Sequence, residues 1–221
     1  MIRLIIIILF SAIITITSSA QSDWYVTSGG ETIFSWNNFD NSPDDGAVIR
    51  FAPVFNIQSM VNKDMNKSFG IYSGIALRNV GFIADDPANT DTTDTRRKFR
   101  TYNVALPLGI KIGNMNGKFL YLGADLEYAF HFKEKKFVDG HKVEKFSYWF
   151  SDRIRKFQPS FHMGIQFWSG TNVKFKYYPK SFFNPDRTDI YDSLYKRFDS
   201  NVFYISLNSN LFKGTRFTYT E

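Results

Sequence analysis

Three residues of this chain have the types that a serine hydrolase uses. Ser160 and His162 lie two residues apart in a segment of alternating polar and apolar side chains, and Glu127 lies in an earlier segment of the same kind. A serine, a histidine and a carboxylate form the triad of many hydrolases, so neighbouring strands could assemble an esterase or deacylase. The alternation places Ser160 and His162 on the polar side, away from any lipid. We therefore expect no catalytic residues, and keep a lipid-modifying hydrolase as the alternative.

A larger set of charged residues occupies the polar positions of the alternating segments. The set carries both signs of charge, and a buried charge needs a partner. We expect a structural polar network inside a barrel, made of Arg50, Arg78, Lys111, Asp125, Glu127, His131 and His162. The same residues leave open a catalytic cluster or a path for protons or small solutes.

Cofactor and metal chemistry has little support in the sequence. The 221 residues include no cysteine, which excludes disulfides, thiolate metal ligands and a cysteine nucleophile. Acidic pairs such as Asp44–Asp45 and Asp85–Asp86 lack the spacing of a calcium-binding loop. We expect no cofactor-binding and no metal-binding residues.

The first twenty residues have the organisation of an export signal. A basic start at Arg3 precedes an apolar run over residues 4–10, and the small residues Ser18 and Ala20 follow. This pattern predicts cleavage after Ala20, because the run is short for a transmembrane helix, which needs about 20 apolar residues. Residues 1–20 are thus expected to be a signal peptide, with an uncleaved anchor as the alternative, and residues 21–221 the exported domain.

The rest of the chain repeats one pattern, in which apolar residues recur at every second position. This period indicates strands, because a helix would show recurrence at three and four residues. Eight segments carry it: 32–36, 49–57, 69–77, 102–112, 120–132, 157–167, 173–177 and 203–211. Strands of about 9–11 residues suit a tilted membrane crossing. The expected fold class is therefore all-β, an eight-stranded antiparallel up-and-down transmembrane β-barrel, with a soluble exported β-barrel binding protein as the alternative.

The connections between these segments alternate in length. Residues 113–117 and 168–171 are tight turns, whereas 38–47, 84–98, 133–153 and 179–199 are long. Outer-membrane barrels have short periplasmic turns and long extracellular loops. This sorting predicts an outer-membrane protein with both termini in the periplasm and a short C-terminal tail over about residues 213–221.

The net charge of +6 has an explanation in this setting. Basic residues crowd the strand ends beside the long loops, where they would lie level with lipid phosphates. They are Arg96, Arg97, Lys98, Arg100, Lys133, Lys135, Lys136, Arg153, Arg155 and Lys156. We therefore expect outer-membrane lipid and lipopolysaccharide as partners, and no nucleic acid.

The expected loops also carry clustered aromatic residues. Tyr148, Trp149 and Phe150 lie in the loop expected over 133–153, and Phe182 and Phe183 lie in the next one. Exposed apolar clusters often mark partner surfaces, although these rings could equally fold back onto the barrel rim. We expect Tyr148, Trp149 and Phe150 to form a partner loop, with another outer-membrane protein as its possible target.

Several segments resemble those of a known family. The runs IRFAPVFNI (49–57), FGIYSGIALRNVGF (69–82), YNVALPLGIK (102–111), VKFKYY (173–178) and NVFYISL (201–207) are similar to small outer-membrane β-barrel proteins of Bacteroidetes-type bacteria described as PorT-like. The resemblance spans roughly residues 29–212 and implies fold and location rather than an activity. The chain departs from it by ending in FTYTE, because such barrels often end on an aromatic residue.

These patterns together predict a non-enzymatic integral outer-membrane barrel. Its expected role is structural or accessory, as a subunit beside a larger envelope complex for secretion, assembly or nutrient uptake.

Overall fold

The computed structural model describes residues 24–39, 48–85, 95–167, 170–186 and 200–213. The expected signal peptide and the tail after residue 213 lie outside these ranges. Ten strands are present in the described residues: β1 (Trp24–Phe39), β2 (Arg50–Ala52), β3 (Ile57–Asp64), β4 (Phe69–Asp85), β5 (Thr95–Gly113), β6 (Phe119–Val138), β7 (His141–Trp149), β8 (Phe157–Gln166), β9 (Thr171–Tyr178) and β10 (Ser200–Lys213). No helix in these ranges is long and apolar enough to cross a membrane.

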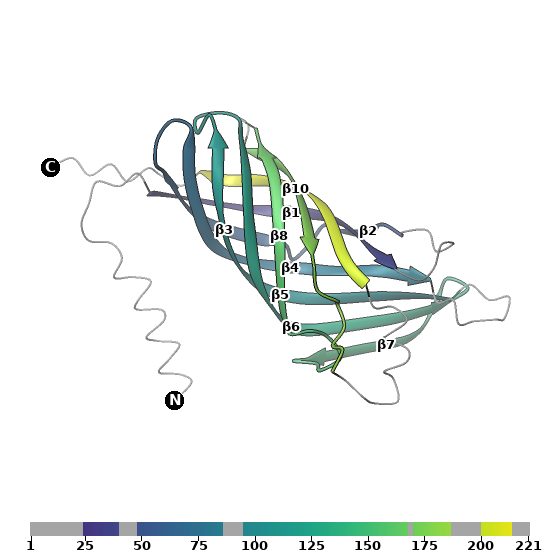
Figure 1. Cartoon of the computed structure of the whole chain (residues 1–221). Coiled ribbons are helices and arrows are strands. Elements are labelled where there is room, and N and C mark those ends of the chain that lie inside the picture. Colours follow the sequence, from purple (N-terminus) through teal and green to yellow (C-terminus); the bar gives the residue numbers. More distant parts are fainter. Residues whose placement is uncertain (1–23, 40–47, 86–94, 168–169, 187–199, 214–221) are drawn as a thin grey trace.

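Eight of the strands close a barrel. Hydrogen-bonded neighbours follow the order β1-β3-β4-β5-β6-β8-β9-β10, and β10 returns to pair with β1. All pairings are antiparallel between successive strands, so the barrel is an up-and-down one (Figure 1). The short β2 pairs with β1 beyond the end of β3, and β7 pairs with β6. The predicted eight-stranded antiparallel barrel is confirmed.

Two short connections of the barrel wall lie together at one end. Turns join β3 to β4 and β5 to β6, and they contact each other through the Met115 amide, which donates to the Lys67 carbonyl. The two ends of the described chain lie at this end too, because Trp24 pairs with Lys63 and Thr27 pairs with Lys213. We call it the short-turn end, and the opposite one the long-loop end.

The alternation predicted one strand over 49–57, but the structure has two strands there. β2 stops at Ala52, and β3 starts only at Ile57. Pro53 has no N–H to donate to a ladder, and Phe55 has a φ of 62°, which interrupts extended backbone. The Asn56 side chain fixes the corner, since its Nδ2 donates to the Ala52 carbonyl at 2.8 Å.

The outer face of the barrel wall is apolar and exposed. Leu106 and Leu108 on β5, Leu126 on β6 and Phe161 on β8 are between 51% and 67% exposed. Similar side chains cover β3, β9 and β10, so the apolar surface continues around the wall. Such a band suits contact with lipid hydrocarbon rather than with water.

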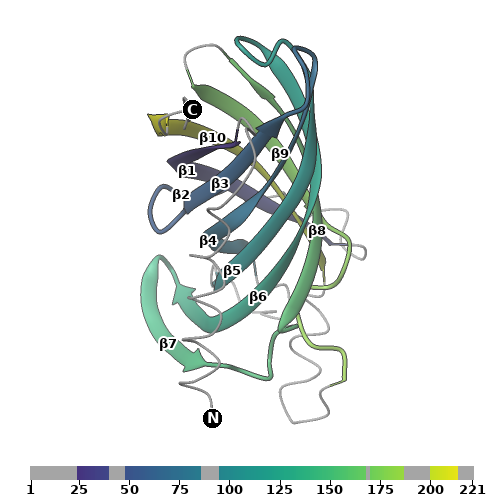
Figure 2. The ribbon, with the colours of Figure 1, turned by 90° about the vertical axis from the view of Figure 1, so that its left-hand side faces the viewer.

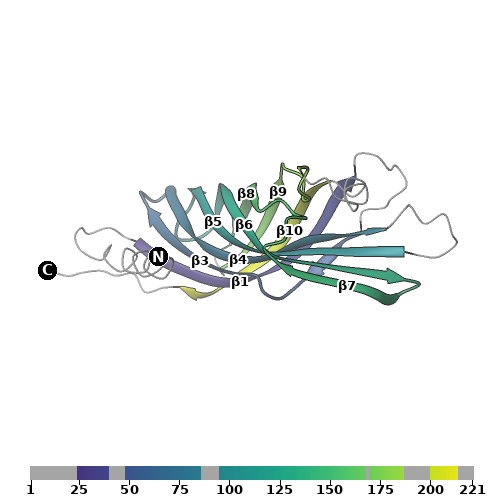
Figure 3. The same ribbon diagram turned by 90° about the horizontal axis from the view of Figure 1, so that it is seen from below.

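Strands β4, β5 and β6 continue past this apolar band toward the long-loop end. A register shift opposite Tyr102 leaves Phe130 as an extra residue in β6, which is a β-bulge. The alternation inverts beyond it, so Phe132 and Glu134 become the buried residues. The expectation of a long loop over 133–153 is therefore wrong for residues 133–149. There β6 and β7 form a hairpin that projects past the ends of β8 and β9 (Figure 3). Figure 2 shows β7 set apart from the barrel wall.

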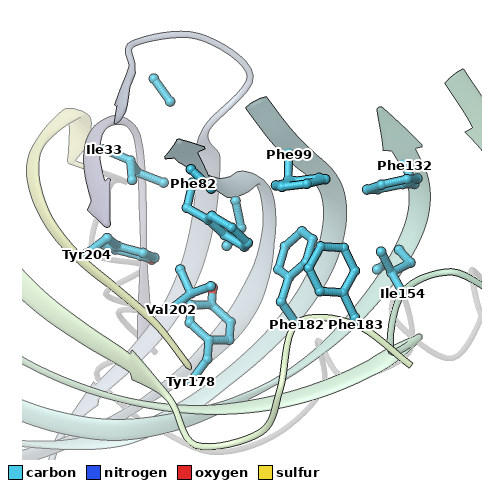
Figure 4. Packing of buried hydrophobic residues seen from close by; sticks show 14 residues of the cluster. Ile33, Phe82, Phe99, Phe132, Ile154, Tyr178, Phe182, Phe183, Val202 and Tyr204 are labelled. Atoms are coloured by element: carbon cyan, nitrogen blue, oxygen red, sulfur yellow. The ribbon is translucent and has the colours of Figure 1, made fainter. Parts of the chain in front are cut away.

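An apolar cluster fills the barrel at the long-loop end. Phe182 and Phe183, from the segment after β9, are only 2% and 3% exposed. Their rings lie against those of Phe82 and Phe99, with centroids 5.1 Å apart in each pair (Figure 4). Of the two alternatives for these rings, the structure shows burial inside the barrel, and we call this cluster the aromatic plug.

Candidate functional site

Charged side chains point into the lumen because successive residues of each strand face opposite sides of the barrel wall. On β9, Lys174 and Lys176 are 4% and 0% exposed, while the intervening Val173 and Phe175 are both 38% exposed on the outer face. The interior of an eight-stranded barrel is just wide enough to be filled by side chains. The inward groups of several strands are therefore forced into contact near the middle of the barrel.

Arg78 of β4 is the centre of this contact. Its guanidinium lies 2.5 Å from Oε2 of Glu31, 3.7 Å from Oδ1 of Asp125 and 3.6 Å from Oε1 of Glu127. All four side chains are at most 1% exposed. Buried charges in this number are stable only when each is paired, so the cluster needs further cations.

Two lysines of β9 supply them. Lys174 Nζ lies 2.9 Å from Oε1 of Glu31, and Lys176 Nζ contacts both Asp125 and Glu127. Arg78, Lys174 and Lys176 give three positive charges, and Glu31, Asp125 and Glu127 give three negative ones. We call these six side chains the ionic cluster, and its formal charges cancel.

Neutral groups add hydrogen bonds to the ionic cluster. Asn103 Nδ2 donates to Glu127 at 2.8 Å, and the Tyr178 hydroxyl donates to the same carboxylate at 2.9 Å. Ser206 Oγ donates to Glu31 at 2.5 Å, and Arg78 donates to the Tyr204 hydroxyl at 3.2 Å. The cluster thus ties together β1, β4, β5, β6, β9 and β10 and occupies the lumen between the aromatic plug and the short-turn end.

His162 lies beside the ionic cluster but does not form the triad considered above. Its Nδ1 is 3.1 Å from Oδ2 of Asp125, and its Nε2 contacts the Tyr72 hydroxyl. Among the described residues, Ser160 Oγ has no hydrogen-bond partner. Both imidazole nitrogens are therefore engaged elsewhere, and the nearby carboxylate is Asp125 rather than Glu127.

Lys111 forms a separate buried pair nearer the short-turn end. Its Nζ lies 2.6 Å from Asp64 Oδ1 and donates to the Tyr25 hydroxyl at 2.8 Å. These residues line a cavity of about 340 Å³, whose wall also includes Arg78 and His162. Turn residues of the short-turn end line it as well, so the space below the ionic cluster is polar and lies toward that end.

Two of the seven residues expected in the lumen network lie elsewhere. His131 follows the β-bulge, so it turns to the outer side, where Nε2 is 3.0 Å from Ser147 Oγ. Arg50 is buried, but its guanidinium donates to the carbonyl of Asn79 at 3.2 Å and to its side chain. Asn79 pairs with outward-facing Tyr102. The expectation for these two residues was wrong because a bulge and a broken strand change the alternation.

The network also contains residues that the sequence reasoning missed. Lys174 and Lys176 stand at polar positions between apolar ones in the seventh segment. Glu31 directly precedes the first segment, on the side opposite Phe34 and Trp36. Applying the alternation to those two short segments would have found them. Tyr72, Tyr178 and Tyr204 could not be found in this way, because tyrosine is as common on a lipid-facing surface as inside.

The aromatic residues expected in a partner loop lie on the β6–β7 hairpin instead. Tyr148, Trp149 and Phe150 are 46%, 67% and 56% exposed. The Trp149 ring stacks on that of Phe130, with centroids 5.8 Å apart, and meets His131 at 4.8 Å. These contacts place the Trp149 ring on the outer surface at the base of the hairpin. Tyr148 pairs with Phe132, so its side chain lies on the opposite face of β7, beside Phe146 and Arg153.

The group of cations expected at the rim also divides between two sides. Arg97 turns inward and lies 2.7 Å from Glu134 Oε1, with side chains 9% and 1% exposed. Lys98, Arg100, Lys133 and Lys135 alternate with buried residues and remain on the outer face.

Comparisons with known proteins concern the fold alone. No family model matches the sequence, and no curated protein matches it. Similar solved structures are those of Ail, the attachment invasion locus protein of Yersinia pestis (14% identity, TM-score 0.37, covering 86% of this chain and 97% of that chain), and Neisserial surface protein A (10%, 0.38, 87% and 100%). CarO of Acinetobacter baumannii is another (11%, 0.36, 82% and 96%). All are outer-membrane β-barrel proteins, and Ail has also been crystallised with the heparin analogue sucrose octasulfate. At these identities and scores the likeness carries no argument about ligand or activity.

Proposed function

We propose that this protein is a non-enzymatic integral outer-membrane barrel with a closed lumen, which serves as a structural or accessory subunit of a larger envelope complex. It presents the β6–β7 hairpin to another envelope protein. The observation that carries the proposal is the exposed surface of Tyr148, Trp149 and Phe150 on a hairpin that projects beyond the apolar band.

The closed lumen supports a role at the surface rather than in transport. A solute entering from the long-loop end meets the aromatic plug, and one entering from the short-turn end meets the ionic cluster. Among the described residues, both barriers consist of side chains that are almost fully buried. A barrel of eight strands has little room to open around them.

The free edge of β7 supports a protein partner. In the described residues β7 pairs with β6 along one edge, from His131↔Trp149 to Val138↔His141. No described strand pairs with the other edge, which offers backbone N–H and C=O groups that an extended partner segment could pair with. Exposed aromatic residues beside such an edge would supply the apolar part of the contact.

The placement in the cell follows from the same features. The apolar band suits an outer-membrane bilayer, and the sorting of connections favours an orientation with the short-turn end, and both termini, in the periplasm. The PorT-like resemblance of the strand segments favours the same location. These assignments form part of the proposal.

A photo-crosslinking experiment in intact cells tests the proposal. A photoreactive amino acid at position 149 should give a crosslink to one other envelope protein, whereas the same group at position 126 should crosslink lipid only. Position 126 is the matched control, because Leu126 is also exposed but lies in the apolar band. Lipid-only crosslinks at position 149 would overturn the partner assignment.

A genetic comparison separates an accessory subunit from an enzyme. The variant Tyr148→Ser/Trp149→Ser/Phe150→Asn should fail to complement a deletion strain at normal membrane abundance. Asn is chosen at position 150 because Phe150 has a φ of 53°, which Asn tolerates well. Ser160→Ala should complement fully. Loss of function with Ser160→Ala alone would instead support the lipid hydrolase.

A further inference from the structure

A second cavity, of about 320 Å³, lies on the outer side of the strand extensions. None of the described residues that line it is a carboxylate, and five of them are cationic: Arg50, Lys98, Arg100, Lys133 and Lys135. Phe51, which is 60% exposed, forms part of the same wall. We call this cavity the basic cavity.

Cations face cations across the strands that build the basic cavity. Lys98 pairs with Lys135, and Arg100 pairs with Lys133, between β5 and β6. Lys135 in turn pairs with Lys145 of β7. Like charges directly opposite each other destabilise a sheet. The fold therefore holds these side chains together at a cost, which a bound anion would remove.

Two described carboxylates near the basic cavity, Asp85 and Glu134, pair with other cations. Asp85 lies 2.8 Å from Arg96, and Glu134 turns inward to Arg97. Within the described part of the chain, none of the five cavity cations forms an ion pair, and Arg50 donates only to the neutral Asn79. Burial, together with the charges of Lys133, Arg100, Lys142 and Lys145, lowers the pKa of Lys135.

The basic cavity borders the apolar band. Ile49, Phe51 and Phe55 lie around β2 and are 63%, 60% and 62% exposed. A ligand bound to the cations can therefore place its apolar portion against these exposed apolar side chains. This arrangement fits an amphiphile with an anionic head, rather than a fully water-soluble anion.

We propose that the basic cavity binds the phosphate groups of a phosphorylated glycolipid in the outer leaflet, with its acyl chains against the apolar band. The inference rests on the proposed outer-membrane placement, with the long-loop end outward. Lysine and arginine side chains are suited to phosphate recognition. The two facing pairs on β5 and β6 provide four such groups on one surface.

The test uses the mature full chain, purified in mild detergent. The probe is lipid A carrying two phosphates, compared with the same lipid after removal of its phosphates, and with inorganic phosphate. Binding is measured by native mass spectrometry and by the rise in the thermal unfolding midpoint, since a ligand that binds only the folded state raises it. The phosphorylated lipid should bind and the other two should not bind at equal concentration.

Charge-removing variants locate the site. Lys133→Gln/Lys135→Gln should weaken lipid A binding by about tenfold or more, and Lys98→Gln/Arg100→Gln is a second such pair. The matched control is Lys67→Gln/Lys118→Gln, which removes two exposed cations at the short-turn end and should change binding by less than about twofold. Without lipid, Lys135→Gln should raise the unfolding midpoint, because it removes a like-charge contact on each side.

Three results would contradict the proposal that the basic cavity binds a phosphorylated lipid. They are equal binding of the lipid without phosphates, equal loss with the control pair, and inorganic phosphate binding as tightly as the lipid. Cell fractionation measures the membrane placement separately. A protein found in the outer membrane whose variants still bind lipid A normally would remove this site but leave the proposed function in place.

Discussion

Arg78 and Glu31 form an ion pair of 2.5 Å across the inside of the barrel, between strands β4 and β1, which β3 separates in the sheet. Each member also contacts a second group, because Glu31 binds Lys174 and Arg78 approaches two carboxylates of β6. The pair is therefore one link in a connected set of contacts, and losing either member leaves the ionic cluster with one unbalanced charge.

The first prediction follows from this link. Glu31→Gln should lower the free energy of unfolding by about 3–5 kcal/mol, because it leaves buried positive charge uncompensated. Urea unfolding in lipid vesicles measures it. The control Glu144→Gln, on exposed β7, should change stability by less than about 0.5 kcal/mol. Equal effects of the two variants would mean that the ionic cluster is not a structural network.

The second prediction concerns the apolar band. Leu126 lies between the inward Asp125 and Glu127 and is 51% exposed on the outer face. Leu126→Arg should cost about 2–4 kcal/mol if this position lies near the middle of the bilayer. Val143→Arg is the matched control: Val143 is 54% exposed but lies on β7, beyond the band. A harmless Leu126→Arg would show that this face does not contact lipid.

The third prediction concerns the two barriers in the lumen. Phe182→Ala should destabilise the barrel by about 3–5 kcal/mol, since it leaves a hole in the aromatic plug. It should nevertheless give no ion conductance in planar bilayers, because the ionic cluster still fills the middle of the barrel. Phe161→Ala, on the outer face, should cost less. Stable open channels formed by Phe182→Ala would show that the plug alone seals the lumen.

The fourth prediction concerns orientation. An epitope tag inserted between Asp139 and Gly140, at the tip of the β6–β7 hairpin, should bind antibody on intact cells. The same tag at Asn116, in a short turn, should bind only after the outer membrane is permeabilised. Antibody binding at Asn116 on intact cells would reverse the proposed orientation.

The barrel could be predicted from the sequence because alternation is a local property of each strand. A run such as Val104, Leu106 and Leu108 shows which face of its strand points outward. Eight such runs, joined by alternating short and long connections, are compatible with few chain topologies. The alternation failed where one residue changed the register. Phe130 of β6 has no partner residue on β5, and no residue type marks that bulge in advance.

Long-range packing was also beyond the reach of the sequence. The sequence left open whether Phe182 and Phe183 are exposed in a loop or fold back onto the rim. Only their contacts with Phe82 and Phe99 show that the segment folds inward. The hairpin was missed for the opposite reason. Its strand His141–Trp149 is exposed along most of its length, so it lacks the two-sided pattern that marks a strand of the wall.

The ionic cluster also has a consequence for the order of assembly. Its acids are encoded early and its lysines late: Glu31 contributes one negative charge, Arg78 one positive charge, and Asp125 with Glu127 two negative charges. The strands before β9 therefore contribute a net charge of minus two to the cluster, which Lys174 and Lys176 of β9 cancel. Ser206 then completes the bonding of Glu31 from β10. The final two strands thus neutralise the interior and close the barrel. A chain truncated before them would carry unbalanced charge into the bilayer.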